Sequence, residues 1–136
     1  MKTISLSNIK GGVSKTTTAS TLAAGLNQRG YKVLMIDSDP QSNLTMCFMK
    51  EPEEGTPSLY NVYKQEKTIQ EVKQNIREGL DLVIGDIDLC VADMEFQGVG
   101  RLKLLYKALK SVETEYDFVI VDTPPNLGIL SLNAFI

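Results

Sequence analysis

Short apolar runs alternate along the chain with segments of helical periodicity. Residues 33–36 (VLMI) and 118–121 (FVIV) are continuous apolar runs, the pattern of strands buried on both faces. Residues 3–8 (TISLSN) and 80–84 (LDLVI) are two further strand candidates. Strands that alternate with helices usually form a parallel sheet with right-handed crossovers. The pattern therefore predicts an α/β fold, with a mostly parallel sheet flanked by helices.

Two segments between these strands have the periodicity of amphipathic helices. From Thr16, apolar residues recur at spacings of three and four as far as Gly30, a residue type that commonly follows the last turn of a helix. Residues 101–112 repeat the pattern with lysines on the opposite face. We expect these lysines to form the solvated side of a helix that packs on the sheet.

Polar and capping residues divide the middle of the chain. Residues 50–57 (KEPEEGTP) contain two prolines and a glycine, and predict an exposed loop with solvated acidic side chains. Ser58 is positioned to cap a short helix. Thr68 and Glu71 form a capping-box pattern at the start of another helix, which we expect to reach Ile76. The middle of the chain should therefore hold short helices before the next strand.

Composition narrows the classes of protein. A length of 136 residues fits one domain, and the absence of histidine excludes Ser-His-Asp and Cys-His catalysis. Cys47 and Cys90 lack the spacing of a zinc site, so we expect ordinary buried residues in a reduced cytoplasmic protein. The net charge of −3 offers no basic footprint for DNA. No apolar stretch reaches the roughly 18 residues of a membrane span, so we expect no membrane association.

Residues 10–17 (KGGVSKTT) lie between the first predicted strand and the first predicted helix. Glycines let successive backbone N–H groups form an anion-binding nest, and the helix N-terminus favours negative charge there. Phosphate is the natural occupant. Lys15 would add a charge at the bridging oxygens, Thr16 would ligate a nucleotide-bound magnesium ion, and Thr17 would contact a further phosphate. The expected nucleotide-binding residues are Lys10, Gly11, Gly12, Val13, Ser14, Lys15, Thr16 and Thr17.

Acidic residues follow two of the buried strands. Asp37 and Asp39 come after residues 33–36, and Asp122 comes directly after residues 118–121. Because the carboxyl ends of parallel strands meet at one edge of a sheet, we expect all three to lie near the phosphate loop. A carboxylate there can hold magnesium or its waters. We assign that role to Asp122; the alternative, that it only caps the next turn, does not account for the neighbouring phosphate loop.

The phosphate segment resembles the deviant Walker A motif, K-G-G-x-x-K-[ST]-[ST], of the ParA/MinD group of ATPases. The ordinary P-loop pattern is not met, because Ile9 and Ser14 stand where its glycines belong. Ser14 also replaces a glycine that is commoner in the family. Residues 37–43 (DSDPQSN) resemble the D-x-D-P-Q-x-N segment of ParA-type partition ATPases, and residues 122–134 resemble their second switch loop. The likeness covers essentially all 136 residues.

The resemblance implies a P-loop NTPase-like fold and a Mg²⁺-dependent ATPase that binds ATP and ADP. In such proteins the second aspartate, here Asp39, orients or activates the attacking water, and the first, here Asp37, lies near the metal. Lys10 would reach across a nucleotide-sandwiched dimer to the phosphates of the other subunit. The implied residues are Lys10, Lys15 and Asp39 for catalysis, and Thr16, Asp37 and Asp122 for the metal.

The resemblance also implies partners. Family members act as nucleotide-dependent dimer switches in plasmid or chromosome segregation, stimulated by a ParB-like centromere-binding protein. Residues 131–136 form an apolar, helix-like end without a cap. We therefore interpret residues 1–136 as the amino-terminal part of a single deviant Walker A ATPase domain. Nonspecific DNA binding, and the nucleoid association of an otherwise cytoplasmic protein, would then depend on the absent carboxyl-terminal region.

Three alternatives differ in function. A fragment could bind nucleotide, or only assemble, without turnover. A MinD-like positioning ATPase would share the phosphate loop, although MinD-type relatives lack the aspartate-Pro-Gln sequence in this form. A small-molecule kinase of the same fold class would need an acceptor site, and the sequence shows none.

Overall fold

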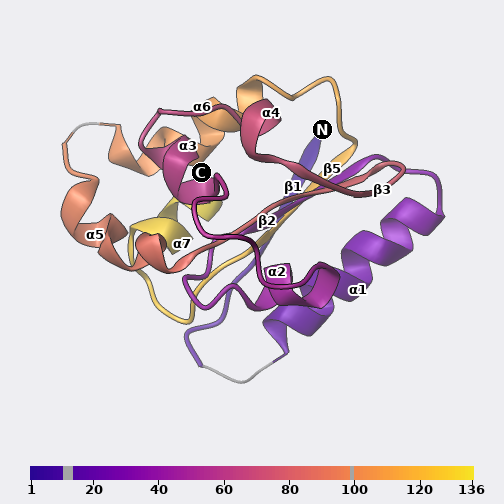
Figure 1. Cartoon of the computed structure of the whole chain (residues 1–136), viewed down its shortest axis with the longest axis horizontal. Coiled ribbons are helices and arrows are strands. Elements are labelled where there is room, and N and C mark those ends of the chain that lie inside the picture. Colours follow the sequence, from indigo (N-terminus) through magenta and orange to yellow (C-terminus); the bar gives the residue numbers. More distant parts are fainter. Residues whose placement is uncertain (11–13, 99) are drawn as a thin grey trace.

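The computed structural model describes residues 1–10, 14–98 and 100–136, and a five-stranded sheet lies at its centre (Figure 1). The strands are β1 (Lys2–Leu6), β2 (Val33–Asp37), β3 (Gln74–Arg77), β4 (Leu80–Val83) and β5 (Phe118–Asp122). Across the sheet they lie in the order β1-β5-β2-β4-β3. Strand β3 runs antiparallel to β4, and the other pairs are parallel. The mostly parallel sheet predicted from the sequence is therefore confirmed.

Helices cover both faces of this sheet (Figure 1). The helices are α1 (Lys15–Gln28), α2 (Asn43–Phe48), α3 (Leu59–Tyr63), α4 (Ile69–Val72), α5 (Ala92–Glu95), α6 (Leu104–Lys110) and α7 (Ile129–Ala134), with 3₁₀ turns η1 (Ile87–Val91) and η2 (Arg101–Lys103). Helices α1 and α2 pack on one face, and α3, α4, α6 and α7 on the other. Within the described ranges, none of the helices combines the length and apolar character needed to cross a membrane.

Side chains along β2 alternate between two apolar cores. Leu34 and Ile36 pack toward α3, α4, α6 and α7, whereas Val33 and Met35 pack toward α1 and α2. All four are fully buried. Neighbouring side chains of a strand point to opposite faces, so a strand covered on both sides is apolar at every position. This is why residues 33–36 form an uninterrupted apolar run.

The helix predicted to run from Thr68 through Ile76 is shorter in the structure. Its capping box is present, since the Thr68 backbone N–H donates to Glu71 Oε2 over 2.8 Å. The helix ends at Val72, however, and Ile76 lies in β3, half-buried against the core under α1. Pairing with β4 across the turn at Gly79 takes precedence over the helical spacing of the apolar residues.

The two cysteines also differ from expectation. Both Cys47, in α2, and Cys90, in η1, are exposed free thiols. The prediction that they are buried was wrong because each lies on the solvent side of a short surface helix. The spacing of apolar residues over one or two turns is too short a pattern to orient such helices.

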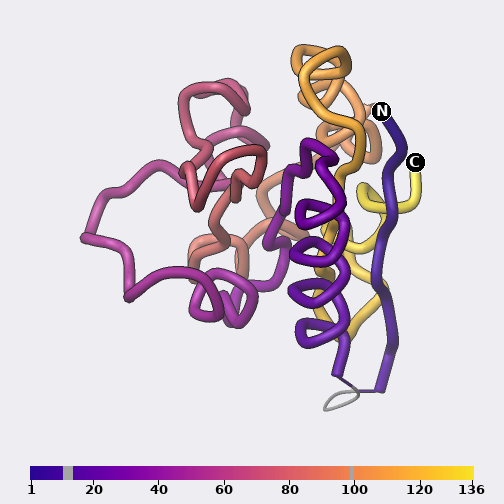
Figure 2. The backbone as a smooth tube through the Cα atoms, turned by 90° about the vertical axis from the view of Figure 1, so that its right-hand side faces the viewer, coloured from indigo at the N-terminus to yellow at the C-terminus, as the bar shows by residue number. Residues whose placement is uncertain are grey.

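The chain ends lie on the same side of the molecule. Figure 2 shows β1 and the last residues after α7 side by side, and the Ser5 hydroxyl donates to the Ala134 carbonyl oxygen. Strand β1 is at one edge of the sheet and pairs with β5 on its inner side. Residues 7–10, which follow β1, lie at the opposite end of this strand from the N-terminus (Figure 2). The described residues that begin and end the predicted phosphate segment are thus near the carboxyl edge of the sheet.

Candidate functional site

The carboxyl ends of β1, β5 and β2 lie next to one another. In the sheet register, Leu6 is opposite Asp122, and Asp122 is opposite Asp37. Strand β5, which lies between β1 and β2, therefore places its terminal carboxylate between the end of β1 and the end of β2. The register thus brings the carboxyl ends of β1, β5 and β2 to one edge, with Asp37 opposite Asp122 as the sequence predicts.

Ser14 precedes α1 in the left-handed region, with φ 58° and ψ 23°. A side chain is strained there and glycine is not, which explains why glycine suits this position of the motif. Lys10 is exposed, and its backbone N–H donates to Asn8 Oδ1 over 2.9 Å. The predicted phosphate-loop residues 11–13 (Gly11, Gly12 and Val13) lie outside the described residues.

Thr16 and Asp122 form the centre of the site. The Thr16 hydroxyl donates to Asp122 Oδ2 over 2.5 Å, and Asp122 is 1% exposed. Its other oxygen, Oδ1, is buried and has no hydrogen-bond partner among the described residues. Burial raises the pKa of the Asp122 carboxyl, while the bond from Thr16 and the charge of Lys15 lower it. An unpartnered buried carboxylate oxygen beside a threonine hydroxyl fits a hydrated Mg²⁺ ion.

The described residues of the site do not supply a complete set of metal ligands. In the part of the chain that the structure describes, no three His, Cys, Asp or Glu side chains group as a metal site. Magnesium in nucleotide sites is usually held by one or two protein oxygens together with phosphate oxygens and waters. The Thr16–Asp122 pair therefore fits a cation that arrives with a nucleotide.

Asp37 and Asp39 have different surroundings. Asp37 is fully buried; its Oδ2 accepts bonds from the Thr45 N–H and hydroxyl, both at 2.7 Å, and its Oδ1 accepts from the Asp39 N–H at 3.2 Å. Burial raises the pKa of Asp37 to about 6, although the bonds from Thr45 oppose the shift. Asp39 is 8% exposed, and its Oδ1 accepts from the Gln41 N–H at 2.9 Å. Asp37 thus braces the loop that Asp39 occupies.

The remaining predicted residues lie at the same edge. Lys15 is half-buried in the first turn of α1, close enough to Asp122 to lower its pKa, and Thr17 is exposed. Sequence reasoning missed Thr45 and Gly85, which contact Asp37 from α2 and from the segment after β4. Neither residue belongs to the motifs that the sequence displays, so only their position in space reveals them.

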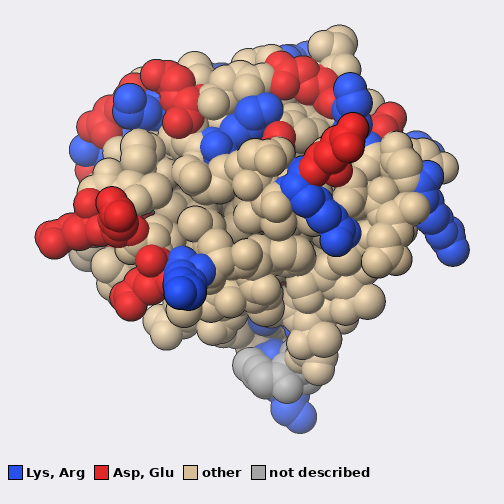
Figure 3. All heavy atoms as spheres, turned by 45° about the vertical axis from the view of Figure 1, so that its right-hand side comes forward, with Lys and Arg blue, Asp and Glu red and all other residues tan. Residues whose placement is uncertain are grey.

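Figure 3 shows how charged side chains are distributed on one face of the molecule. On the face shown in Figure 3, lysine and arginine are interspersed with aspartate and glutamate, and no continuous basic area is visible. This agrees with the net charge of −3. The surface visible there is not the kind that binds nucleic acid through its phosphates.

Comparison with known sequences places the whole chain in one family. The family model described as an AAA domain, AAA_31, matches residues 1–136. The sporulation initiation inhibitor protein Soj of Bacillus subtilis (strain 168) is 36% identical over 135 residues, which are 98% of this chain and 53% of Soj. The chromosome partitioning protein ParA of Myxococcus xanthus (strain DK1622) is 37% identical over 133 residues, 96% of this chain and 47% of that protein. The chain thus spans about half the length of these relatives.

Solved structures agree with this placement. Cobyrinic acid a,c-diamide synthase from Mycobacterium smegmatis, with bound ATP analog and magnesium, matches with a TM-score of 0.94 and 34% identity, over 98% of this chain and 54% of that one. A putative plasmid partition protein from Borrelia burgdorferi B31, bound to AMPPNP, gives 0.86 and 28%, over 98% and 58%. The names of these relatives imply different activities. The similarity therefore identifies the fold and the family of this chain, but it does not identify one reaction.

Proposed function

Because the chain belongs to the AAA_31 family of AAA domains and resembles ParA- and Soj-type partition ATPases over nearly its whole length, we propose that it binds ATP and ADP with Mg²⁺ and hydrolyses ATP. The observation that supports this most directly is the Thr16–Asp122 pair, in which a buried oxygen of Asp122 has no hydrogen-bond partner among residues 1–10, 14–98 and 100–136. Relatives of the same fold hold an ATP analog or ADP with magnesium.

The residues around this pair have separate proposed roles. Lys10, Ser14, Lys15, Thr16 and Thr17 bind the phosphates together with residues 11–13. Thr16 and Asp122 hold the Mg²⁺ ion, which would neutralise charge on the phosphate oxygens. The metal assignment of Asp37 stays a prediction. Its hydrogen bonds to Thr45 and Asp39 favour an indirect role, in which Asp37 fixes the neighbouring loop and does not itself bind the ion.

Asp39 is the proposed catalytic carboxylate. It lies two residues after the end of β2 and is only slightly exposed. Its backbone N–H donates to Asp37, and its side chain accepts from the Gln41 N–H. A carboxylate held in this way can orient or activate the attacking water without itself binding the phosphates.

Hydrolysis and binding can be tested separately. Wild-type chain should bind ATP in a Mg²⁺-dependent manner by calorimetry and release phosphate. Asp39→Ala should keep the affinity within about threefold and lose about 100-fold or more in turnover. Equal phosphate release from both proteins would reject the catalytic assignment for this chain. Mg²⁺-dependent binding with no turnover in either protein would instead support a nucleotide-binding fragment, the second candidate, which the half-length match favours.

The dimer switch is the finer part of the proposal. Lys10 is exposed just before the phosphate loop, where its side chain is free to reach a second subunit. A positive charge supplied in trans would stabilise the transferring phosphoryl group. Lys10→Ala should therefore lower turnover by about 100-fold, and light scattering coupled to gel filtration should show weaker ATP-dependent dimerisation. A Lys10→Ala protein that dimerises and hydrolyses ATP normally would contradict this role.

The partners belong to the whole protein. We propose that it segregates plasmids or chromosomes as a cytoplasmic, nucleoid-associated dimer, stimulated by a ParB-like centromere-binding protein. Nonspecific DNA contacts are proposed to come from regions beyond residues 1–136, since the face in Figure 3 lacks a basic area. DNA added to this chain should accordingly leave its ATP turnover unchanged.

A further inference from the structure

Thr45 joins three segments behind the Asp39 loop. It is fully buried in α2, and its N–H and hydroxyl both donate to Asp37 Oδ2 at 2.7 Å. The same hydroxyl oxygen accepts a bond from the Gly85 N–H at 3.2 Å. One side chain thus connects the end of β2, helix α2 and the segment that follows β4.

This connection continues to the backbone of Asp39. The second oxygen of Asp37 accepts from the Asp39 N–H, and the Asp39 carbonyl accepts from the Ser42 N–H at 2.9 Å, just before α2. Two residues at the start of α2 therefore hold the loop from Asp37 to Ser42: Thr45 donates to the Asp37 side chain, and Ser42 donates to the Asp39 carbonyl.

Gly85 supports the same loop by close packing. A Cβ atom at Gly85 would lie 2.9 Å from the carbonyl oxygens of Asp37 and Asp39, and 3.2 Å from Asp37 Cγ. Its backbone does not adopt a positive φ, so space alone requires glycine. The segment after β4 can come this close to the loop only because position 85 has no side chain.

We propose that Thr45 is a positioning residue for the reaction: it holds Asp37, and through Asp37 and Gly85 it fixes Asp39 toward the phosphate site. The catalytic part of this inference rests on the proposed function. Thr45 contacts Asp37 and Gly85, so we expect it to affect the reaction only through the position of the Asp39 loop. Without the hydroxyl, Asp37 loses a buried donor and Gly85 loses its acceptor, and the loop must rearrange to satisfy them.

Two substitutions separate the hydroxyl from the shape of the side chain. Thr45→Val keeps the shape and removes the hydroxyl, and Thr45→Ser keeps the hydroxyl. Thr123→Val is the matched control: Thr123 is also buried at this edge, but its hydroxyl donates to the Leu6 carbonyl at 2.9 Å. Amide hydrogen exchange by NMR, without nucleotide, should rise at least tenfold at Asp39 and Gly85 in Thr45→Val. It should stay near wild type in Thr45→Ser and Thr123→Val.

Kinetics then test the consequence for catalysis. In Thr45→Val, kcat should fall about tenfold while KM for MgATP changes less than threefold, because the hydrogen bonds of this hydroxyl to the described residues go to Asp37 and Gly85, and neither belongs to the phosphate segment. Thr45→Ser should recover most of kcat. Partial unfolding alone would not lower kcat while leaving KM nearly unchanged. It would also not explain a recovery of kcat in Thr45→Ser.

Each outcome decides the inference. Unchanged exchange at Asp39 and Gly85 in Thr45→Val overturns it, and raised exchange with unchanged kcat overturns its catalytic part. A wild-type chain that does not hydrolyse ATP contradicts the proposed function, while exchange still decides whether Thr45 holds the loop. If Thr45→Val does not fold, Gly85→Ala tests the same brace from the other side, and unchanged exchange at Asp39 in that variant would overturn it.

Discussion

Ser14 is the residue at which the phosphate motif and the backbone disagree most clearly. Its left-handed conformation, with φ 58°, is the one that glycine adopts without strain. The sequence singled out this position as the departure from the commoner motif, and the structure supplies the reason. A serine is tolerated here at a cost in stability.

Ser14→Gly should therefore stabilise the chain by about 0.5–1 kcal/mol, because relief of the left-handed strain exceeds the added chain entropy of glycine. Urea unfolding measures this. Ser111→Gly is the control, since Ser111 has φ −68° and its substitution should destabilise. A lower stability in Ser14→Gly would show that the serine side chain contributes more than its strain.

Tyr116 connects two segments far from the nucleotide edge. Its hydroxyl donates to Asp81 Oδ2 at 2.5 Å and accepts from Lys73 Nζ at 2.9 Å. Burial, followed by the bond to Asp81, raises the pKa of Tyr116 to about 12. Because the folded-state pKa lies above the unfolded value near 10, the stability from this group is complete below pH 10 and is lost as pH rises toward 12.

Tyr116→Phe should lower the free energy of unfolding by about 1 kcal/mol near pH 8. It should also make stability fall less steeply between about pH 10 and 12 than in wild type. Urea unfolding across this range measures both effects. Tyr106→Phe, on an exposed tyrosine of α6, is the matched control. Identical pH profiles for wild type and Tyr116→Phe would contradict the role of this hydroxyl.

Among the elements, the β3–β4 hairpin departs furthest from the sequence prediction. Its turn residue Gly79 has φ +73°, and Asn27 of α1 donates to the neighbouring Glu78 carbonyl at 3.0 Å. A Cβ at Gly79 would lie 3.0 Å from Asn27 Nδ2. The hairpin is therefore shaped by contact with α1, which explains why helical spacing near Ile76 did not predict it.

Gly79→Ala should destabilise the chain by about 1–2 kcal/mol through backbone strain, and somewhat more through the contact with Asn27. Gly55→Ala separates backbone strain from the contact with Asn27. Gly55 has φ +82°, and a Cβ atom there would have no described atom within 4 Å. Thermal or urea unfolding of both variants gives the comparison. Equal destabilisation would mean that the contact with α1 adds nothing to the strain.

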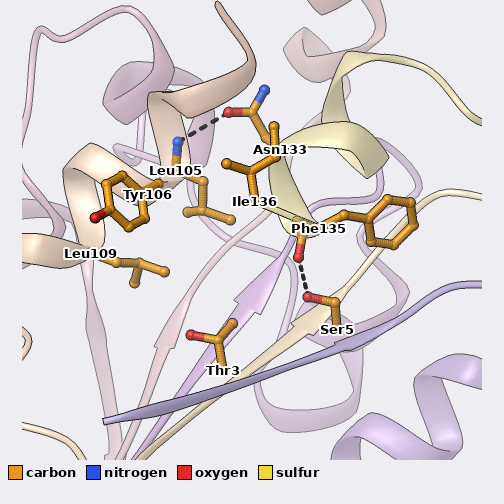
Figure 4. A pocket seen from close by; sticks show the side chains of 9 residues that line it. Thr3, Ser5, Leu105, Tyr106, Leu109, Asn133, Phe135 and Ile136 are labelled. Carbon is orange, nitrogen blue, oxygen red and sulfur yellow. Dashed lines mark hydrogen bonds between the residues drawn. The ribbon is translucent and has the colours of Figure 1, made fainter. Parts of the chain in front are cut away.

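Strand β1 forms one edge of the sheet, with no strand paired on its outer side among the described residues. A cleft of about 380 Å³ lies between β1, α6 and α7 (Figure 4). Tyr106, Phe135 and Ile136 lie around it and are 44%, 52% and 53% exposed. An edge strand beside exposed apolar side chains favours association.

The chain should therefore associate as its concentration rises, which light scattering would detect. Phe135→Ser combined with Ile136→Ser should shift this association to higher concentration, because it removes apolar surface next to the edge strand. Met94→Ser, at an exposed methionine of α5, is the control and should leave association unchanged. If both proteins associate equally, another surface is responsible.

Several helices and strands could be predicted from local patterns of apolar and capping residues. Continuous apolar runs located β2 and β5, and capping residues located the starts of α3 and α4. The phosphate motif predicted a strand before it and a helix at its end, where the structure has β1 and the first turn of α1. The convergence of Asp37, Asp39 and Asp122 also followed from the sequence, because parallel strands bring their carboxyl ends to one edge.

The residues that support Asp37 and Asp39 could not be predicted from local patterns, because they come from distant segments of the chain. The roles of Thr45 and Gly85, and the formation of the half-buried strand β3, depend on contacts between segments that are distant in the sequence. The spacing of residues along the chain does not reveal these contacts. The same holds for the burial of the Asp122 oxygen that lacks a partner in the described part of the chain, and for the exposure of Cys47 and Cys90. Burial and hydrogen-bond partners are properties of packing, so they appear only when the strands, helices and loops are assembled.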